Sequence, residues 1–460
     1  MLRLLLILTF LSGTAMAWAQ RENSIRPEEK IYGLSKFWQE VNYNFAFFGQ
    51  VPELNWDSVY QAYIPIILAT ESDYDYYKAL ERMCALLQDG HTNIYMPSRI
   101  DSLLYRTSFG DYRLFLENVD GKAIITHVNE PKKEEVPVGS EVIQVNGMPV
   151  KAYLEKEVIP YISSSTDYIL WDNGIRGLLK GFKGESIDIR IRTPKGLERS
   201  LHLTRALNKE AIYPPFPDWE LLNFKWMEKD IAYVALNSFG DEKIDTLFIE
   251  KVPELLKAKA LIIDIRNNGG GSTTIGLEIA KYLTEDTLLF GSRSMTREHR
   301  AAYKAWGYWV ADENKDTLID EWEKTSLDYF NGNVWHEFEY APDTNDVKGP
   351  RIVVPTVILT SHNTASAAED FLVYLDGQPH ITRIGQKTYG STGQPLMLEL
   401  PGGGSARICT KKDVFPDGRE FVGYGIIPQI EVAPTVEDFI QTRDRALEKA
   451  VEVLKGKLQD

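Results

Sequence analysis

A serine stands where a predicted strand gives way to a predicted helix, in the sequence Thr-Ala-Ser366-Ala-Ala-Glu369. The β-branched run at 353–359 is typical of a buried strand, and the small residues around Ser366 open a helix. A hydroxyl at such a junction lies at the rim of a sheet, beside helix-start N–H groups that can stabilise an oxyanion. Ser366 could therefore be a nucleophile. The same spacing also fits an S-x-x-E capping box, in which the serine only caps the helix, so this stretch alone leaves both interpretations open.

A glycine-rich loop follows the predicted strand 258–265 and contains Gly269, Gly270 and Gly271. Successive glycines let the backbone approach a ligand closely, and their N–H groups could point at a developing negative oxygen. No Gly-Lys-Ser/Thr follows the loop, and no Gly-x-Gly-x-x-Gly pattern fits, which excludes a P-loop and a dinucleotide site. The structural alternative is a tight turn that binds nothing.

Seven histidines compete for the role of a histidine base for the serine. His91 follows Asp89-Gly90, where a predicted helix ends, and it precedes a short predicted strand. His362 is nearest to Ser366 in sequence, but at a strand end its side chain is expected to point away from a serine four residues on. A lone histidine is more often structural than catalytic, so the residues by themselves do not choose between these two.

The elements that must position these residues fall into three segments. Residues 21–104 are predicted to be helical, and 105–206 to form a small domain of short alternating strands. Residues 207–460 alternate strands with helices, which predicts a mixed sheet with crossover helices. A polar, Trp- and Tyr-rich insertion at about 290–350 interrupts this core and could line or cover the site. The predicted fold class is therefore multidomain, with α/β and α+β parts.

Residues 1–20 have the pattern of a secretory signal peptide. A short basic start precedes an apolar core from Leu4 to Leu11, and small-x-small cleavage sites follow at 15–19. The apolar run is too short to span a bilayer well, and no other stretch approaches membrane-spanning length. We therefore expect no membrane span in the mature chain, and an exported protein, periplasmic or extracellular.

The composition excludes several classes of partner. The formal net charge of −15 argues against nucleic acid and against anionic membrane as partners. Neither Cys-x-x-Cys nor His-Glu-x-x-His occurs in the chain. We therefore expect no structural or catalytic metal and no cofactor.

Read in order, the motifs resemble the C-terminal processing peptidase and tricorn-core family of serine peptidases. Residues 137–150 by themselves resemble the central segment of a PDZ domain, a module that binds extended peptide tails by strand addition; the structural alternative is a small β domain that braces its neighbour. The resemblance implies a helical N-terminal region, a PDZ-like domain and a crotonase/ClpP-like mixed α/β catalytic core. It also implies hydrolysis of a peptide or protein substrate. The other motifs that carry it are Asp89-Gly-His-Thr92, Asp264-Ile-Arg-Asn-Asn-Gly-Gly-Gly271, Thr364-Ala-Ser-Ala-Ala-Glu369, Gly390-Ser-Thr-Gly-Gln-Pro395 and Gly423-Tyr-Gly-Ile-Ile-Pro428.

The family has two catalytic designs, and the sequence discriminates between them. The processing-peptidase branch uses a Ser–Lys dyad whose lysine lies in a Gly-Lys-Gly loop after the serine. Here that position reads Gly390-Ser391-Thr392-Gly393, and Lys387 precedes the loop glycine. The tricorn-like branch uses Ser and His, supported by a serine and a glutamate. Its histidine lies before the PDZ-like module, where His91 stands, so the resemblance favours this branch.

The resemblance implies acyl transfer, in which Ser366 attacks a peptide carbonyl and His91 takes its proton. N–H groups of Gly270 or Gly271 and of Ala367 would then hold the oxyanion.

The tricorn-like design also needs supporting polar residues. Glu420 is the candidate carboxylate that orients the imidazole or its partner, and Asp417 is the second candidate. Tricorn-type sites carry a serine beside the histidine, where this chain has Gly90. We expect Ser391 to supply the missing hydroxyl.

Two other functions compete with the peptidase. A catalytically idle relative could bind peptides or lipophilic ligands, which the aromatic residues at 31–60 and 300–340 would allow. A crotonase-type CoA enzyme shares the sheet and the oxyanion logic. It has no use for a nucleophilic serine at a helix start, however, and export would separate it from CoA. Intact Ser366 and His91 favour the peptidase.

Overall fold

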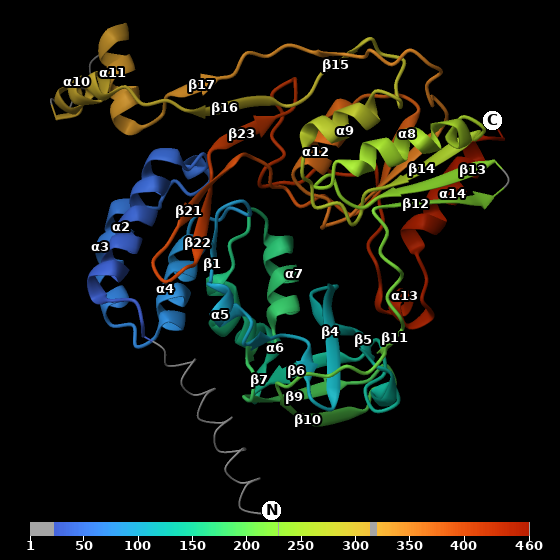
Figure 1. Ribbon diagram of the computed structural model, residues 1–460, viewed down its shortest axis with the longest axis horizontal. Coiled ribbons are helices and arrows are strands. Elements are labelled where there is room, and N and C mark those ends of the chain that lie inside the picture. The colour runs from blue at the N-terminus through green and yellow to red at the C-terminus, as the bar shows by residue number, and fades with distance from the viewer. Residues whose placement is uncertain (1–22, 229, 313–319, 460) are drawn as a thin grey trace, which may run out of the picture.

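The computed structural model describes residues 23–228, 230–312 and 320–459, so the predicted signal peptide lies outside the described residues. The described chain forms a helical unit at its N-terminal end, a β-rich unit and a mixed α/β core (Figure 1). The predicted class, a multidomain fold that mixes helices and sheets, is confirmed. Within these residues, every helix is too short or too polar to cross a membrane.

The N-terminal unit packs three helices around aromatic side chains. Asn55 and Ser72 cap the second and third helices, each by accepting a hydrogen bond from a backbone N–H three residues on. Phe37, Tyr76 and Tyr77 are fully buried between them. The helices are α2 (Pro27–Asn44), α3 (Trp56–Leu68) and α4 (Asp73–Ala85), with a 3-10 turn, η1 (Phe48–Gln50).

A short strand ties this unit to the core. β1 (Asn93–Tyr95) begins two residues after His91 and pairs antiparallel with β22 (Ser405–Cys409), with Asn93 opposite Arg407. β22 pairs in turn with β21 (Pro395–Glu399), which follows the loop 386–394. The pairing therefore brings His91 to a loop that lies about three hundred residues further along the chain.

The β-rich unit is one twisted sheet in the order β10-β9-β6-β5-β4-β3. Side chains of β9 are alternately exposed and buried, as the period-2 pattern predicts. The short β7 (Met148–Pro149) and β11 (Ile212–Tyr213) pair with β6 and β5, and two helices, α6 (Val150–Tyr153) and α7 (Asp167–Gly177), complete the unit. The main strands are β3 (Ser108–Phe109), β4 (Tyr112–Val119), β5 (Lys122–Asn129), β6 (Glu141–Val145), β9 (Ser186–Arg192) and β10 (Glu198–Thr204).

The core sheet runs in the order β12-β13-β14-β19-β20-β24, and all neighbours except β12 and β13 are parallel. Helices α8, α9 and α12 cover one face, and α14 covers the other (Figure 1). β13, β14 and β19 are therefore buried on both faces, which explains their continuous apolar runs. The elements are β12 (Leu222–Glu228), β13 (Ile231–Leu236), β14 (Ala260–Asp264), β19 (Thr356–Thr360), β20 (Ile381–Gly385), β24 (Ile430–Glu431), α8 (Lys243–Leu255), α9 (Thr273–Ala280), α12 (Ala367–Tyr374) and α14 (Arg445–Lys457).

The insertion between β14 and β19 forms an arm. Its ribbon of β16 (Arg293–Arg297) and β17 (Trp335–Glu337) extends from β23 (Lys411–Val414) and ends in α10 (Ala301–Asp312) and α11 (Glu321–Asn331). In Figure 1 these two helices project at the upper left, beyond the N-terminal helices. Just before α10 the arm rests on α2, where Arg297 Nη1 donates to the carbonyl of Asn42 at 2.6 Å.

Candidate active site

Ser366 lies between β19 and α12 in a strained backbone conformation. Its φ is 57° and its ψ is −127°, whereas a helix N-cap normally has extended dihedrals. Few residues other than glycine adopt this region, which costs about 1–3 kcal/mol and occurs preferentially at functional sites. The Ser366 N–H donates to the Glu369 side chain at 3.1 Å, as in the predicted capping box, but the Ser366 hydroxyl accepts no capping hydrogen bond. Capping alone gives no reason for the strained dihedrals, so the geometry favours a functional serine.

The glycine loop lies directly against Ser366 because β14 and β19 are paired neighbours in a parallel sheet. Their carboxyl ends, and the loops that follow them, meet at one edge. A Cβ placed on Gly270 would be 2.6 Å from Ser366 Cβ and 2.9 Å from the Ala367 nitrogen. The backbones of the two loops can approach this closely only because residue 270 has no side chain.

His91 is buried in the turn before β1, with 8% of its surface exposed. Burial, the largest influence, lowers the pKa of its imidazole below the usual 6.5. The turn is held from both sides: Gly90 N–H donates to Ser165 Oγ at 2.9 Å, and Arg407 Nη2 donates to the Gly90 carbonyl at 3.1 Å. His91 is therefore a fixed imidazole that is neutral near pH 7, which is the form a general base needs.

Ser391 connects His91 to Ser366. Its hydroxyl lies 2.6 Å from His91 Nδ1, and its carbonyl accepts the Ser366 N–H at 3.1 Å. A Cβ on Gly90 would lie 3.1 Å from the same hydroxyl, so a side chain at position 90 would crowd Ser391. The hydroxyl expected beside the histidine thus comes from the loop 386–394 in this chain.

Glu369, which follows Ser366 by three residues on α12, is completely buried. It accepts hydrogen bonds from the N–H groups of Ser366 (3.1 Å), Gly390 (2.9 Å) and Ser391 (3.2 Å), and from the hydroxyl of Thr388 (2.5 Å). Burial raises its pKa to about 8, although these hydrogen bonds act in the opposite direction. Glu369 therefore fixes the loop of Ser391 to the helix of Ser366. The sequence offered the S-x-x-E spacing, but not this contact.

The other predicted carboxylates lie in different surroundings. Glu420 forms an ion pair with Lys412 at 2.5 Å, and Asp417 pairs with Arg419 at 2.6 Å, with the side chains of both acids largely exposed. His91 Nδ1 contacts Ser391 rather than Glu420. His362, the rival base, pairs through Nδ1 with Asp172 of α7 at 2.6 Å.

The predicted oxyanion donors differ in how their N–H groups are used. Gly270 N–H donates to the side-chain oxygen of Asn268 at 3.0 Å. Within the described part of the chain, the N–H groups of Gly271 and Ala367 donate to no protein acceptor. Gly271 and Ala367 therefore have free donors, and that of Gly270 is occupied.

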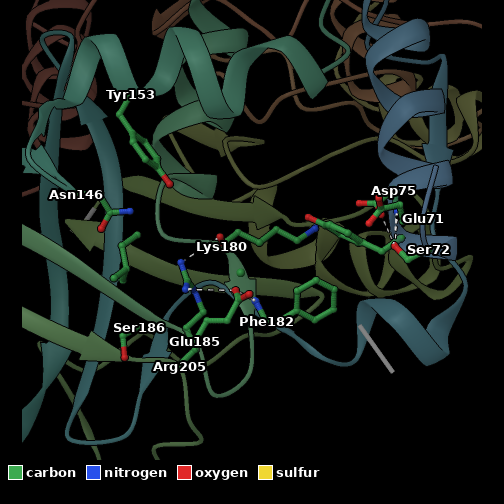
Figure 2. Close-up of a pocket in the computed structure, with 13 residues that line it drawn as sticks. Glu71, Ser72, Asp75, Asn146, Tyr153, Lys180, Phe182, Glu185, Ser186 and Arg205 are labelled. Carbon is green, nitrogen blue, oxygen red and sulfur yellow. Dashed lines mark hydrogen bonds and ion pairs between the residues drawn. The ribbon is translucent and has the colours of Figure 1, made fainter. Parts of the chain in front are cut away.

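A further polar cavity of about 940 Å³ lies between α4 and the β-rich unit (Figure 2). Its cations already have partners: Arg205 donates to the carbonyl of Leu179 at 3.0 Å, and Lys180 Nζ lies 3.7 Å from Asp101. The cavity is lined by none of the predicted catalytic residues. The candidate catalytic residues therefore lie around Ser366 and not in this cavity.

Comparison with known proteins identifies the family of the core. Residues 230–432, which carry the glycine loop, Ser366 and Ser391, match peptidase family S41. The core is that of a family S41 peptidase. The predicted family is thereby confirmed, and the chain is a serine-type peptidase, a hydrolase that acts on peptides or proteins.

The similarity of this peptidase to its relatives extends beyond the core. The carboxyl-terminal-processing protease of Picosynechococcus sp. is 24% identical over 389 residues, covering 83% of this chain and 78% of that protein. The chloroplastic C-terminal processing peptidase of Tetradesmus obliquus is 22% identical over 380 residues, covering 78% and 68%. The solved structure of mature CPAF complexed with lactacystin shares the fold, with a TM-score of 0.68, 15% identity and coverage of 94% of this chain and 98% of that one.

The lowered pKa of His91 predicts the acid limb of the peptidase's pH profile. If His91 is the general base, protonation removes the lone pair that accepts the serine proton, so activity falls as the pH drops through the pKa of His91. Because burial lowers that pKa, the midpoint in kcat/KM is expected below pH 6.5. Initial rates on a quenched-fluorescence peptide across pH 4.5–8 would measure it. A midpoint clearly above 6.5 would contradict a buried imidazole as the base.

Proposed function

We propose that this exported peptidase cleaves peptide bonds by a Ser–His mechanism, with Ser366 as nucleophile and His91 as general base. The observation that carries the proposal is the position of Ser391, which contacts the His91 imidazole through its hydroxyl and the Ser366 N–H through its carbonyl. A single residue thus holds base and nucleophile in the same neighbourhood. The stretch Gly390–Gly393, where the Ser–Lys design has its lysine, contains none, and Lys387 precedes it.

The reaction begins with His91 neutral. With the proton on Nδ1 and donated to Ser391 Oγ, the lone pair on Nε2 is free to accept the Ser366 hydroxyl proton. Ser366 Oγ bonds to the peptide carbonyl carbon, and the carbonyl oxygen becomes an oxyanion. Nε2 then returns its proton to the leaving amine as the C–N bond breaks. Water activated by the same imidazole hydrolyses the acyl-enzyme and restores Ser366.

Ser391 and Glu369 act in this scheme as positioning residues. Ser391 selects the His91 tautomer that leaves the Nε2 lone pair free, and we assign it the orienting contact expected earlier of Glu420. Glu369 binds the backbone on both sides of the nucleophile, at Ser366 and at the loop 390–391. The strained dihedrals of Ser366 are then maintained by contacts from two elements.

We also infer that the β-rich unit is a PDZ-like module and that the chain is exported. The module is supported by its sheet with two helices and by the pattern at 137–150. Its helix α7 contacts the catalytic loops, since Tyr168 donates to the carbonyl of Thr388 at 2.7 Å. Export is supported by the signal-peptide pattern of residues 1–20.

A fluorophosphonate probe tests the mechanism, because it reacts with serines that are activated as nucleophiles. We expect a single label on the peptide that contains Ser366. His91→Ala is expected to slow labelling by about 100-fold or more, the usual contribution of a general base. His202→Ala is the matched control, because His202 pairs with Asp188 on an exposed sheet surface and should label at the wild-type rate. A label on another residue, or an unchanged rate in His91→Ala, would refute the proposal.

A further inference from the structure

The buried side chain of Asn268 holds the glycine loop in place. Asn268 is completely buried, although it lies among exposed residues: both Asn267 and Gly269 are exposed. Three glycines in succession have a large conformational freedom, which folding must remove if their N–H groups are to keep fixed directions. A buried asparagine side chain at the start of such a loop must have hydrogen-bond partners inside the protein.

Asn268 connects three neighbouring strand ends. Its Nδ2 donates to the carbonyl of Leu236, at the end of β13, at 3.0 Å. Its Oδ1 accepts the N–H of Gly270 at 3.0 Å, which closes a side-chain turn over Gly269. Its own carbonyl accepts the N–H of Ala365, the residue before the nucleophile, at 3.1 Å. One residue thus sets the loop against β13 and against Ser366.

These contacts decide which glycine can serve an oxyanion. The N–H of Gly270 is bound by Asn268, so it cannot turn to a substrate without breaking that bond. The carbonyl of Gly270 accepts the Phe239 N–H at 3.0 Å, and the Ser272 N–H donates to the Phe239 carbonyl at 2.8 Å. Gly271 is therefore held on both sides, and its own N–H has no acceptor among the described residues. A Cβ at Gly271 would lie 2.1 Å from the Phe239 backbone, so the fit requires glycine.

We propose that Asn268 is a positioning residue for the oxyanion hole, which it confines to the N–H groups of Gly271 and Ala367 by binding that of Gly270. This inference rests on the proposed Ser–His function. It assigns Gly271, besides Ala367, as the second N–H donor to the oxyanion. The substrate contacts Gly271, and Asn268 acts through the loop without touching the substrate. If the Gly271 N–H loses its alignment with the oxyanion, stabilisation of the transition state should weaken more than binding of the substrate.

Steady-state kinetics of Asn268→Ala test the proposal. We expect kcat to fall by about 100-fold, the usual effect of losing one oxyanion donor, with KM changed by less than about threefold. Asn268→Ser should recover to within about 10-fold of wild type, because a serine hydroxyl can also accept the N–H two residues on. Asn267→Ala is the matched control, since that exposed neighbour should be dispensable. A folded Asn268→Ala with wild-type kcat, or an Asn268→Ser as slow as Asn268→Ala, would overturn the assignment.

A measurement on the unmutated protein covers the case in which Asn268→Ala does not fold. In protein labelled with ¹⁵N-glycine, a peptide boronate that forms a tetrahedral adduct with Ser366 should move the amide signal of Gly271 and protect it from hydrogen exchange. The signal of Gly270 should already be protected and should change little. A shift of Gly270 without Gly271 would overturn the inference. Ser366→Ala separates the two proposals, because a fully active Ser366→Ala would refute the mechanism itself.

Discussion

Ser366→Ala is expected to lower kcat/KM on a peptide substrate by at least about 10⁴-fold, because no covalent intermediate can form without the hydroxyl. The variant should fold, since alanine removes one oxygen from a partly exposed side chain. Hydrolysis of a quenched-fluorescence peptide, with enzyme concentration raised to detect residual turnover, would measure the loss. Ser98→Ala, an exposed serine at the start of α5 (Ser98–Asp101), should retain wild-type activity.

The strained backbone at Ser366 gives this prediction a second readout. Glycine adopts the observed φ of 57° without a Cβ penalty, whereas alanine keeps that penalty. Ser366→Gly should therefore be as inactive as Ser366→Ala, with a free energy of unfolding about 1 kcal/mol higher. Urea denaturation of the two variants would show the difference. Equal stability would mean that the dihedrals at 366 store no strain, and residual activity in both would remove Ser366 from the mechanism.

Glu369→Ala is expected to have the largest effect on stability. It leaves the buried N–H groups of Gly390 and Ser391 and the Thr388 hydroxyl without their acceptor, whereas the Ser366 N–H keeps the Ser391 carbonyl. Each unsatisfied buried donor costs about 1–3 kcal/mol, so a loss of about 3 kcal/mol or more in the free energy of unfolding is expected even if water enters. Activity should fall as well, because the loop of Ser391 loses its attachment to α12. Urea denaturation and peptide hydrolysis would measure the two effects.

Glu369→Gln separates the carboxyl's hydrogen bonds from its charge. The amide can donate to Thr388 and accept from Ser366 and Ser391, so about one donor is left unsatisfied and a cost of about 1–2 kcal/mol is expected. Because the folded pKa of about 8 lies above the ordinary 4.5, Glu369 binds more protons in the folded state. Its contribution to stability is full below pH 4.5 and declines as the pH rises to 8. The advantage of wild type over Glu369→Gln in the free energy of unfolding should therefore fall as the pH rises over that interval and reverse before pH 8.

The matched control for both variants is Glu399→Gln, an exposed glutamate on β21. Its unfolding free energy should match that of wild type at every pH in the interval. If Glu369→Gln were as unstable as Glu369→Ala near pH 7, the carboxyl would have to be ionised and held by all its donors. That result would contradict the raised pKa.

The sequence was sufficient for the parts of the site that are local. Ser366 at a strand-to-helix junction and the glycine loop after β14 are each contained in about ten consecutive residues. Their mutual approach also followed from the pattern, because consecutive parallel strands carry their carboxyl ends to one edge of the sheet. Glu369 could have been found from the S-x-x-E spacing, but that spacing gave no sign of complete burial or of its contacts with residues 388–391.

Contacts between segments far apart in the sequence could not be predicted from such local patterns. Glu420 was preferred because it lies in a turn before a recognised motif, yet its charge pairs with Lys412 on the neighbouring strand. The partner of His91 is Ser391, three hundred residues away. That contact depends on the register of β1 against β22, and a shift of one residue would turn every side chain of β1 to the opposite face. No spacing within the sequence encodes that register.

The sequence by itself thus determined the class of chemistry and the family and singled out Ser366 as the candidate nucleophile, because these depend on residue types within short continuous motifs. Only the tertiary structure decided which hydroxyl holds the imidazole, which carboxyl joins the loops and which glycine N–H remains free. Those choices depend on hydrogen-bond geometry between strands that meet only after folding, where a difference of one ångström decides whether a donor is bound or available.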